Sequence, residues 1–361
     1  MPRVGVIGAG ISGLLCAQRL SELVTSAQLT IFEWGRGPGG RTARRRVTLS
    51  DGREISFDHA TPFISSTTPK FDEILARWEA QGVAARWPEV RKSTFVGTPS
   101  NNAIARGLTS ELEAQGARVL FGHHVRAATF LPESKQWRVN ALSRATGELA
   151  SWDFDVLILS DKLLVLPNQY AVLPEADWGP LALPSGLTSS GTVVLLIALE
   201  HAASDALNSF PAVHRSAAGA PATIIDLVVH DASKPQRSGP LDTWVVHSTA
   251  EYAATHLRGE ALDDEAAVLE EMQTAFLRLL QEATQSCSGT PPPPVAWASV
   301  FAWDHAQPTA ESRLRDSSHL LDTHRRAGVC GDFFGSAQGV EAAASSGMAL
   351  AEALAPLLTE M

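Results

Sequence analysis

Glycines close to the N-terminus have the spacing of a dinucleotide-binding turn. Gly8, Gly10 and Gly13 form the pattern GxGxxG directly after the apolar run Arg3–Ile7, and Glu33 follows twenty residues after the last glycine. In such a turn the first glycine allows a sharp bend, the second lets backbone amides approach a pyrophosphate, and the third lets a helix pack closely. A carboxylate at the position of Glu33 accepts hydrogen bonds from ribose hydroxyls. The pattern therefore predicts a dinucleotide site.

The segments around these glycines have the pattern of one βαβ unit. Arg3–Ile7 and Gln28–Glu33 are short apolar runs typical of buried parallel strands. Between them, small and apolar residues recur at helical spacing over residues 13–24. The amides of Ile11 and Ser12 would begin that helix and face the phosphates.

A second glycine-rich segment follows the predicted second strand. Gly39 and Gly40 let the backbone approach a ligand, and Arg36 and Arg41 offer positive charge to phosphate groups. The segment resembles the GG-arginine motif of the amine-oxidase-like flavoprotein superfamily, which implies FAD as the dinucleotide, bound non-covalently. The alternative is a solvated basic loop, because residues 44–46 are also arginines.

The far end of the chain resembles the C-terminal flavin motif of the same superfamily. Asp332 follows Gly331, and an alanine-rich helix is predicted to begin near Gly339. In that superfamily the carboxylate meets the ribityl-phosphate region, and the N-terminus of the next helix points at the flavin ring. The resemblance thus implies further cofactor contacts by Val340 and Glu341. The alternative is a glycine-rich turn before a helix.

Within that superfamily the chain is similar to the renalase family and its bacterial renalase-like members. Besides the glycine motifs, the similarity covers residues 71–82, 233–235, 242–249 and 329–347. Members of this family oxidise off-pathway dihydro isomers of NAD(P) to NAD(P)+, and oxygen then takes the electrons from the flavin to give hydrogen peroxide. The resemblance implies this reaction here, with a flat-ringed small molecule and molecular oxygen as partners.

The same resemblance implies cofactor contacts by Ala60, Thr61 and Val125. Two departures from the family concern the substrate rather than the flavin. Phe63 stands where the family carries a tyrosine, so that a hydroxyl is lost. Trp303 is kept from a family His-Arg-Trp sequence, but the sequence here is Phe-Ala-Trp and lacks the arginine.

Three side chains are the catalytic candidates. His247 lies in an apolar run and matches a family histidine near the flavin, where it could hydrogen-bond the substrate or hold a proton. Trp303 and Phe63 could form an apolar wall that stacks a flat, nicotinamide-like ring parallel to the flavin. For each of the three, a core residue without a ligand is the alternative.

The chain is predicted to be an α/β protein of two domains. Residues 1–70, 100–165 and 325–361 are expected to form a Rossmann-like FAD-binding domain, with a mostly parallel sheet and a small antiparallel insert. Residues 71–99 and 166–324 are expected to form an α+β substrate domain with a mixed or antiparallel sheet.

Apolar periodicity places the remaining elements within these domains. Strands are predicted over residues 118–121, 125–131, 137–142 and 155–160 in the first domain, and over 192–199, 243–248 and 295–301 in the second. Helices are predicted around residues 71–78, 104–112 and 269–283.

Composition and charge restrict the class of protein. The 361 residues are 45% hydrophobic and 19% charged, as in a folded globular chain, and the net charge of -10 disfavours nucleic acid or a membrane surface as partner. Cys16, Cys287 and Cys330 are scattered, with no CxxC pair for a metal site, which favours a reducing, cytoplasmic compartment. No signal peptide is predicted, and Glu352 and Pro356 interrupt the last apolar stretch.

Two other functions stay open at this point. A flavin amine oxidase commonly has an aromatic cage and a lysine near the flavin, but the only tyrosines are Tyr170 and Tyr252, and no lysine follows Lys234. A flavin-binding protein with little catalytic activity is the other alternative, because pocket positions are changed relative to the family.

Overall fold

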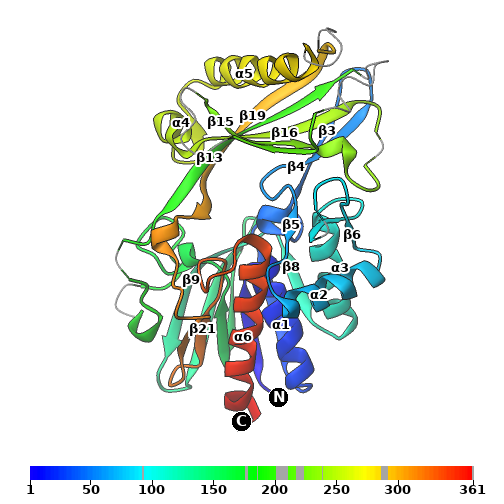
Figure 1. The fold of residues 1–361 in the computed structure, drawn as a ribbon. Helices are drawn as coiled ribbons and strands as arrows, with labels where there is room; N and C mark the ends of the chain where they lie inside the picture. Colours follow the sequence, from blue (N-terminus) through cyan, green and yellow to red (C-terminus); the bar gives the residue numbers. More distant parts are fainter. Residues whose placement is uncertain are drawn as a thin grey trace.

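A computed structural model of the chain describes most of its length. The described residues are 1–91, 93–174, 178–184, 186–200, 210–216, 223–237, 239–285 and 292–359. Of the residues singled out above, Cys287 lies outside these ranges. The described elements form two main sheets with their own helices, one above the other in Figure 1.

The lower sheet has six strands and contains the predicted βαβ unit. Its order is β20-β21-β12-β1-β2-β8, and every neighbouring pair is parallel except β20 and β21. The strands are β1 (Arg3–Ile7), β2 (Gln28–Glu33), β8 (Arg118–Phe121), β12 (Val156–Leu159), β20 (Leu320–Asp322) and β21 (Ala327–Val329). The predicted α/β class with a Rossmann-like sheet is confirmed.

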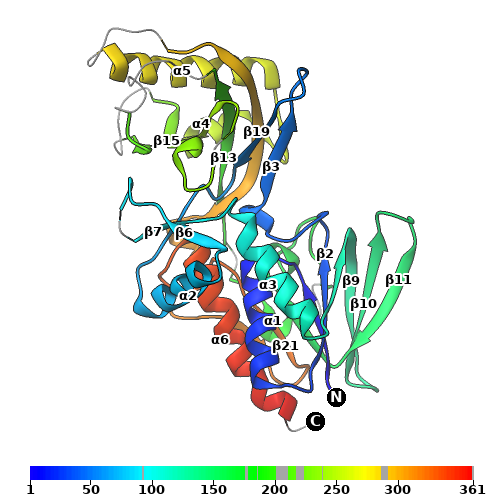
Figure 2. The same ribbon diagram turned by 90° about the vertical axis from the view of Figure 1, so that its right-hand side faces the viewer.

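Helices cover one face of the lower sheet and a small sheet covers the other. The helices are α1 (Ile11–Leu23), α3 (Asn102–Ala114) and α6 (Gly339–Thr359), and the small antiparallel sheet consists of β9 (His123–Leu131), β10 (Gln136–Ser143) and β11 (Leu149–Phe154). Side chains of consecutive residues in a strand point to opposite faces of the sheet, so they pack alternately against the helices and against the small sheet. Ile31 thus packs with the helices and Phe32 with the small sheet. Figure 2 shows this layering from the side.

The upper sheet is antiparallel, with the order β14-β15-β16-β13-β19. Its strands are β13 (Ser189–Leu199), β14 (Val213–Arg215), β15 (Ile225–His230), β16 (Asp242–Ser248) and β19 (Val295–Pro308). Helices α4 (Ala250–His256) and α5 (Glu265–Gln285) pack on one face, to which Val193 and Leu195 point. Val194 and Leu196 point to the opposite face, where Phe57 and Trp87 lie. That second face takes part in the functional site.

Shorter elements lie between the two main sheets or beside one of them. They are β3 (Arg44–Thr48), β4 (Glu54–Asp58), β5 (Ile64–Ser65), α2 (Pro69–Ala80), β6 (Ala84–Arg86), β7 (Thr94–Gly97), β17 (Leu257–Arg258) and β18 (Ala261–Leu262). Phe71 and Trp78 of α2 lie in the same core cluster as α1 and α6. This packing favours grouping α2 with the lower sheet, whereas the sequence pattern grouped residues 71–99 with the substrate domain.

Within the described part of the chain, α6 is the one helix long and apolar enough to cross a membrane by length and composition. Half of its apolar window is buried inside the protein. Leu350, Leu354 and Leu358 lie in the core cluster that contains α1. Burial in this core accounts for the apolar composition of α6.

Gly347 lies where α6 packs against α1, and it leads to a prediction about this contact. A Cβ atom at Gly347 would lie 2.2 Å from the carbonyl oxygen of Ser12 and 3.2 Å from the amide nitrogen of Cys16. We expect Gly347→Ala to lower the free energy of unfolding by about 1–3 kcal/mol, because overpacking outweighs the gain in helix propensity. Urea unfolding measures the change. Ser345→Ala, on the exposed side of α6, is the control, and equal losses in the two variants would contradict the prediction.

Candidate functional site

The GxGxxG turn after β1 has two glycines without room for a side chain and one that faces open space. A Cβ atom at Gly8 would lie 2.3 Å from Ser160 Oγ, and one at Gly13 would lie 2.2 Å from the Gly8 carbonyl oxygen. Gly8 also has a φ of +103°, which favours glycine. A Cβ atom at Gly10 would meet nothing within 4 Å. The turn is therefore tightly packed at Gly8 and Gly13 and open at Gly10, which leaves room for a phosphate beside the backbone.

The N-terminus of α1 opens into this space. Gly10 precedes the helix and provides no side-chain cap, and its first turn contains no acidic residue. The amides of the first turn thus lack a capping side chain, and they carry the partial positive charge of the helix end. Glu33 lies nearby, and its carboxylate accepts hydrogen bonds from the amides of Ala9 (2.9 Å) and Gly35 (2.6 Å). Burial raises the pKa of Glu33 despite these bonds.

A cavity of about 390 Å³ extends from this turn toward the upper sheet. Most of the residues predicted to bind the cofactor line it, together with two of the three catalytic candidates. These lining residues are Gly8, Gly10, Ile11, Ser12, Glu33, Gly39, Gly40, Arg41, Ala60, Thr61, Phe63, His247, Asp332, Gly339 and Val340.

Five residues predicted to bind the cofactor are placed differently. Arg36 is exposed, Val125 is buried in the core of the lower sheet, and the amide of Gly331 donates to Ser346 Oγ (3.0 Å). Gly13 serves the packing described above. Glu341 is also turned away from the cavity.

The carboxylate of Glu341 is held by the loop before α2. Its Oε2 accepts hydrogen bonds from the amide and the hydroxyl of Thr67, each at 2.8 Å, and its Oε1 accepts one from Thr68 Oγ1 (2.5 Å). Glu341 is 1% exposed. It therefore anchors α6 to this loop and does not line the cavity.

Arg41 and Asp332 join the two predicted motifs from opposite ends of the chain. The guanidinium donates two hydrogen bonds to the carboxylate, from Nη1 to Oδ2 at 2.6 Å and from Nη2 to Oδ1 at 2.8 Å, and Nη1 also donates to the Ala306 carbonyl oxygen (3.0 Å). Burial would raise the pKa of Asp332, but the charge and hydrogen bonds of Arg41 outweigh burial and hold that pKa below its usual range. Arg41 was predicted to offer charge to the phosphates, and in the structure its guanidinium is paired with Asp332.

His247 lies on β16 at the boundary of the cavity, in line with Val194 of β13 and Leu227 of β15. Its Nε2 is 2.8 Å from the carbonyl oxygen of His59. A carbonyl only accepts, so Nε2 carries the proton and Nδ1 has a free lone pair. Burial lowers the pKa of His247 from 6.5 to about 4. The imidazole is therefore neutral at physiological pH and acts as an acceptor through Nδ1.

The two aromatic candidates lie on different walls. Phe63 lines the first cavity, and its ring centroid is 6.5 Å from that of Trp87. Trp303 pairs with Thr192 in the register of β13 and β19, and its ring is 5.3 Å from that of His59. Trp303 lines a second cavity and not the first.

The second cavity, of about 620 Å³, adjoins the first. The two have Ala60, His247, Ala306 and Gln307 as common lining residues. One elongated ligand that extends from the N-terminus of α1 and a second ligand beside Trp303 would therefore meet at His247.

Several lining residues had no signal that we recognised in the sequence. Ser160 and Asp161 follow β12, which lies beside β1, and the rule that ligands bind at the carboxyl ends of parallel strands could have identified them. Arg215 and Arg313 also line the first cavity, but neither lies in a motif. Arg313 Nη1 donates to the carbonyl oxygen of Asp332 (3.0 Å).

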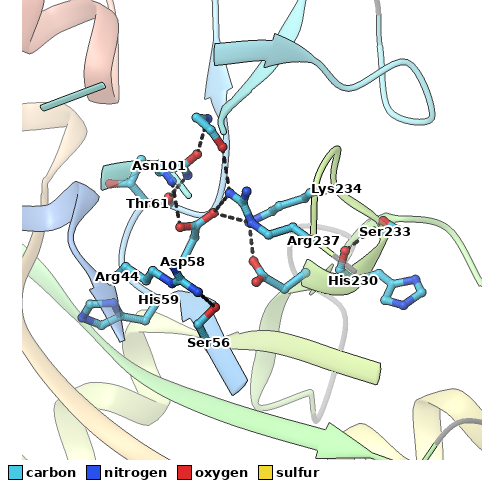
Figure 3. A network of polar contacts seen from close by, with 12 residues as sticks. Arg44, Ser56, Asp58, His59, Thr61, Asn101, His230, Ser233, Lys234 and Arg237 are labelled. Atoms are coloured by element: carbon cyan, nitrogen blue, oxygen red, sulfur yellow. Dashed lines mark hydrogen bonds and ion pairs between the residues drawn. The ribbon is translucent and has the colours of Figure 1, made fainter. Parts of the chain in front are cut away.

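A buried network of charges holds the segment that leads into the site (Figure 3). Asp58 Oδ2 accepts hydrogen bonds from Lys234 Nζ (3.2 Å) and Arg237 Nη2 (2.6 Å), and Oδ1 accepts one from the amide of Asn101 (2.9 Å). Lys234 also pairs with Asp231. Burial would raise the pKa of Asp58, but the two cations lower it below its ordinary value. The network joins the end of β4 to the loop between β15 and β16.

Known proteins share this architecture. A family described as "NAD(P)-binding Rossmann-like domain" matches residues 6–78. A protein assigned as a protoporphyrinogen oxidase from Exiguobacterium sp. 255-15 superposes with a TM-score of 0.66 at 12% sequence identity, covering 98% of this chain and 99% of that chain.

Two further solved structures are similar over nearly their whole length. Cyclohexylamine oxidase from Brevibacterium oxydans IH-35A has a TM-score of 0.57 at 12% identity, with 99% of each chain covered. An oxidoreductase from Methanosarcina mazei has a TM-score of 0.55 at 15% identity, with 97% of this chain and 100% of that chain covered. At such identities the similarity establishes the fold.

The lowered pKa of His247 predicts a pH-dependent contribution to stability. Unfolded histidine binds a proton below pH 6.5, whereas folded His247 does so only near pH 4, so acid favours the unfolded state between these values. We expect the stability contributed by His247 to be complete above pH 7 and to fall by about 3 kcal/mol by pH 4. The measurement is urea unfolding of the wild type and His247→Gln across this range. A difference between the two proteins that stays constant with pH would contradict the assignment.

Proposed function

We propose that this chain is an FAD-dependent oxidoreductase, with the dinucleotide in the first cavity and the substrate in the second. The observation that carries the proposal is the junction of the two cavities at His247. A dinucleotide-binding turn lies in the first cavity and an aromatic wall lies in the second, so a cofactor ring and a substrate ring would meet between them.

The residues of the first cavity fit FAD. Gly10 and Gly339 have open space where a Cβ atom would be, and both line the cavity at the beginning of a helix. The amides that begin α1 would receive the pyrophosphate, and Glu33 lies at the end of β2, where it would meet the ribose. When bound, FAD supplies a two-electron acceptor for a hydride. The start of α6 at Gly339 would place partial positive charge near the ring that accepts it.

The chain's own residues would bind and orient the substrate. Phe63 and Trp303 offer apolar surface on two walls, and apolar walls exclude water from the reacting atoms. His247 holds no proton on Nδ1 at neutral pH, so its role is to accept a hydrogen bond from the substrate. Hydride transfer needs no general base when the donor ring becomes aromatic, so positioning is the main task.

Within this class we propose dihydro isomers of NAD(P) as substrates and oxygen as the final acceptor, in a cytoplasmic setting. Support comes from the renalase resemblance and from the flat wall that Trp303 provides. A flavin amine oxidase is a second candidate. It is favoured by two carboxylates, Asp226 and Glu251, that line the second cavity and suit a cationic group.

Gly10 offers a test of cofactor binding that is separate from folding. Gly10→Val would place its side chain in open space in the cavity, so we expect loss of FAD uptake with a melting temperature close to that of the apo wild type. Gly37→Val is the matched control, because a Cβ atom there also meets nothing within 4 Å but Gly37 does not line the cavity. The measurements are the visible spectrum and the shift in melting temperature on adding FAD. Equal FAD uptake by both variants would contradict the proposed site.

Anaerobic mixing tests the reaction itself. We expect a dihydro isomer of NAD(P) to bleach the visible band of the FAD-loaded protein, and admission of oxygen to restore the band with release of hydrogen peroxide. Bleaching by amines instead would favour the amine oxidase. Bleaching by dithionite alone would indicate a flavin-binding protein with little turnover.

A further inference from the structure

Three buried polar atoms near the ion network around Asp58 have no hydrogen-bond partner among the described residues. They are the indole nitrogen Nε1 of Trp87, the carboxylate oxygen Oδ2 of Asp231 and the guanidinium nitrogen Nη1 of Arg237. Trp87 is 0% exposed and Asp231 is 1% exposed, so bulk solvent does not reach them. A buried polar group without a partner costs free energy, and nearly all such groups in folded proteins bind a protein atom or an ordered water molecule.

The three residues gather around the ammonium group of Lys234. Asp231 binds this ammonium through its other oxygen, Oδ1, and the ammonium nitrogen lies 5.9 Å from the centre of the Trp87 ring. Arg237 and Lys234 come from the same loop between β15 and β16, and both donate to Oδ2 of Asp58 (Figure 3). Trp87 comes from another part of the chain, between β6 and β7. The unpartnered atoms therefore belong to one cluster, built from separate segments.

The charges and the hydrogen-bonding groups of this cluster restrict what could bind there. The carboxylates of Asp58 and Asp231 are balanced by the cations of Lys234 and Arg237, so the ionised cluster is neutral as a whole and does not favour an ion. Two of the unpartnered atoms, on Trp87 and Arg237, are donors, and the one on Asp231 is an acceptor. The ligand that suits this site is small, neutral, and both a donor and an acceptor.

We propose that this cluster binds an internal water molecule, which accepts hydrogen bonds from Trp87 Nε1–H and Arg237 Nη1–H and donates one to Asp231 Oδ2. A buried water typically makes about three hydrogen bonds, which is the number offered here. Burial raises the pKa of Asp231, and water suits either form of this side chain, because it can donate to the carboxylate or accept from the carboxylic acid. None of the three residues lines either cavity, so the inference does not depend on the proposed function.

The bound water would strengthen the contact between the loop and the β6–β7 hairpin. Arg237 Nη2 already donates to the carbonyl oxygen of Gly97 at the end of β7 (2.8 Å). A water between Arg237 and Trp87 would add a second link from the same guanidinium to this hairpin. The ring centroid of Trp87 is 6.5 Å from that of Phe63, which lines the first cavity. The water would therefore help to hold the ring that lies behind Phe63.

Nuclear magnetic resonance of the full chain tests the inference. Magnetisation transfer through space from water to an indole N–H shows that a bound water lies beside it, and in the rotating frame its sign differs from that of chemical exchange. We expect this transfer at Trp87 and none at Trp137, whose indole is equally buried but donates to the carbonyl oxygen of Arg325 (2.7 Å). Trp87→Phe and Trp137→Phe assign the two signals. A Trp87 signal without transfer from water would overturn the inference.

A high-resolution crystal structure is the second measurement, and it needs no variant. It separates a bound water from protons that are relayed through the Lys234 ammonium. We expect density for one water at a hydrogen-bonding distance, about 2.7–3.2 Å, from Trp87 Nε1, Arg237 Nη1 and Asp231 Oδ2. Direct bonds from these atoms to other protein groups, or a dry cluster, would overturn the inference.

Discussion

The rest of the structure depends on the buried charges around Asp58. This carboxylate ends β4 and is bound by Lys234 and Arg237 from the upper sheet, while Asn101 binds it from the lower one. Removing one partner from such a buried network costs about 3–5 kcal/mol, because the remaining charge has no compensation. The chain continues from Asp58 into His59, whose carbonyl fixes the tautomer of His247. The ion pairs around Asp58 therefore also help to position His247, which lies where the two cavities meet.

The two cavities have different charged linings. The lining of the first cavity explains how a protein with a net negative charge could hold an anionic cofactor. The first cavity is lined by three arginines and three carboxylates, Arg41, Arg215, Arg313, Glu33, Asp161 and Asp332. Because Arg41 is paired with Asp332, the phosphates of the proposed cofactor would rely on backbone amides at the start of α1 and not on an excess of side-chain charge. The second cavity is lined by the carboxylates of Asp226 and Glu251, and none of its described lining residues is a lysine or an arginine.

The features that could be predicted from the sequence are those whose determining residues lie close together in the chain. The GxGxxG turn, its flanking strands and the carboxylate at Glu33 are encoded within about thirty residues, and runs of apolar residues predicted β13, β16 and β19. Ion pairs between residues far apart in the sequence left no recognisable pattern in it. Arg41 and Asp332 are 291 residues apart, and no pattern in either motif distinguishes a mutual salt bridge from two separate phosphate contacts. Glu341 likewise lies in the first turn of α6, but the direction of its side chain is set by Thr67 and Thr68 on another loop.

The two differences from the renalase family, at Ala302 and at Phe63, lie in different places in the structure. The register of β19 gives the position of Ala302. Ala302, which replaces the family arginine, pairs with Val193, and Val193 packs beneath α4 and α5, away from Phe57 and Trp87. Strand alternation places Ala302 on that helix side, so the lost arginine does not remove a charge from the face on which Trp303 packs. Phe63, in contrast, lines the first cavity directly. Of the two differences from the renalase family, the one at Phe63 is therefore the one that lies at the proposed cofactor site.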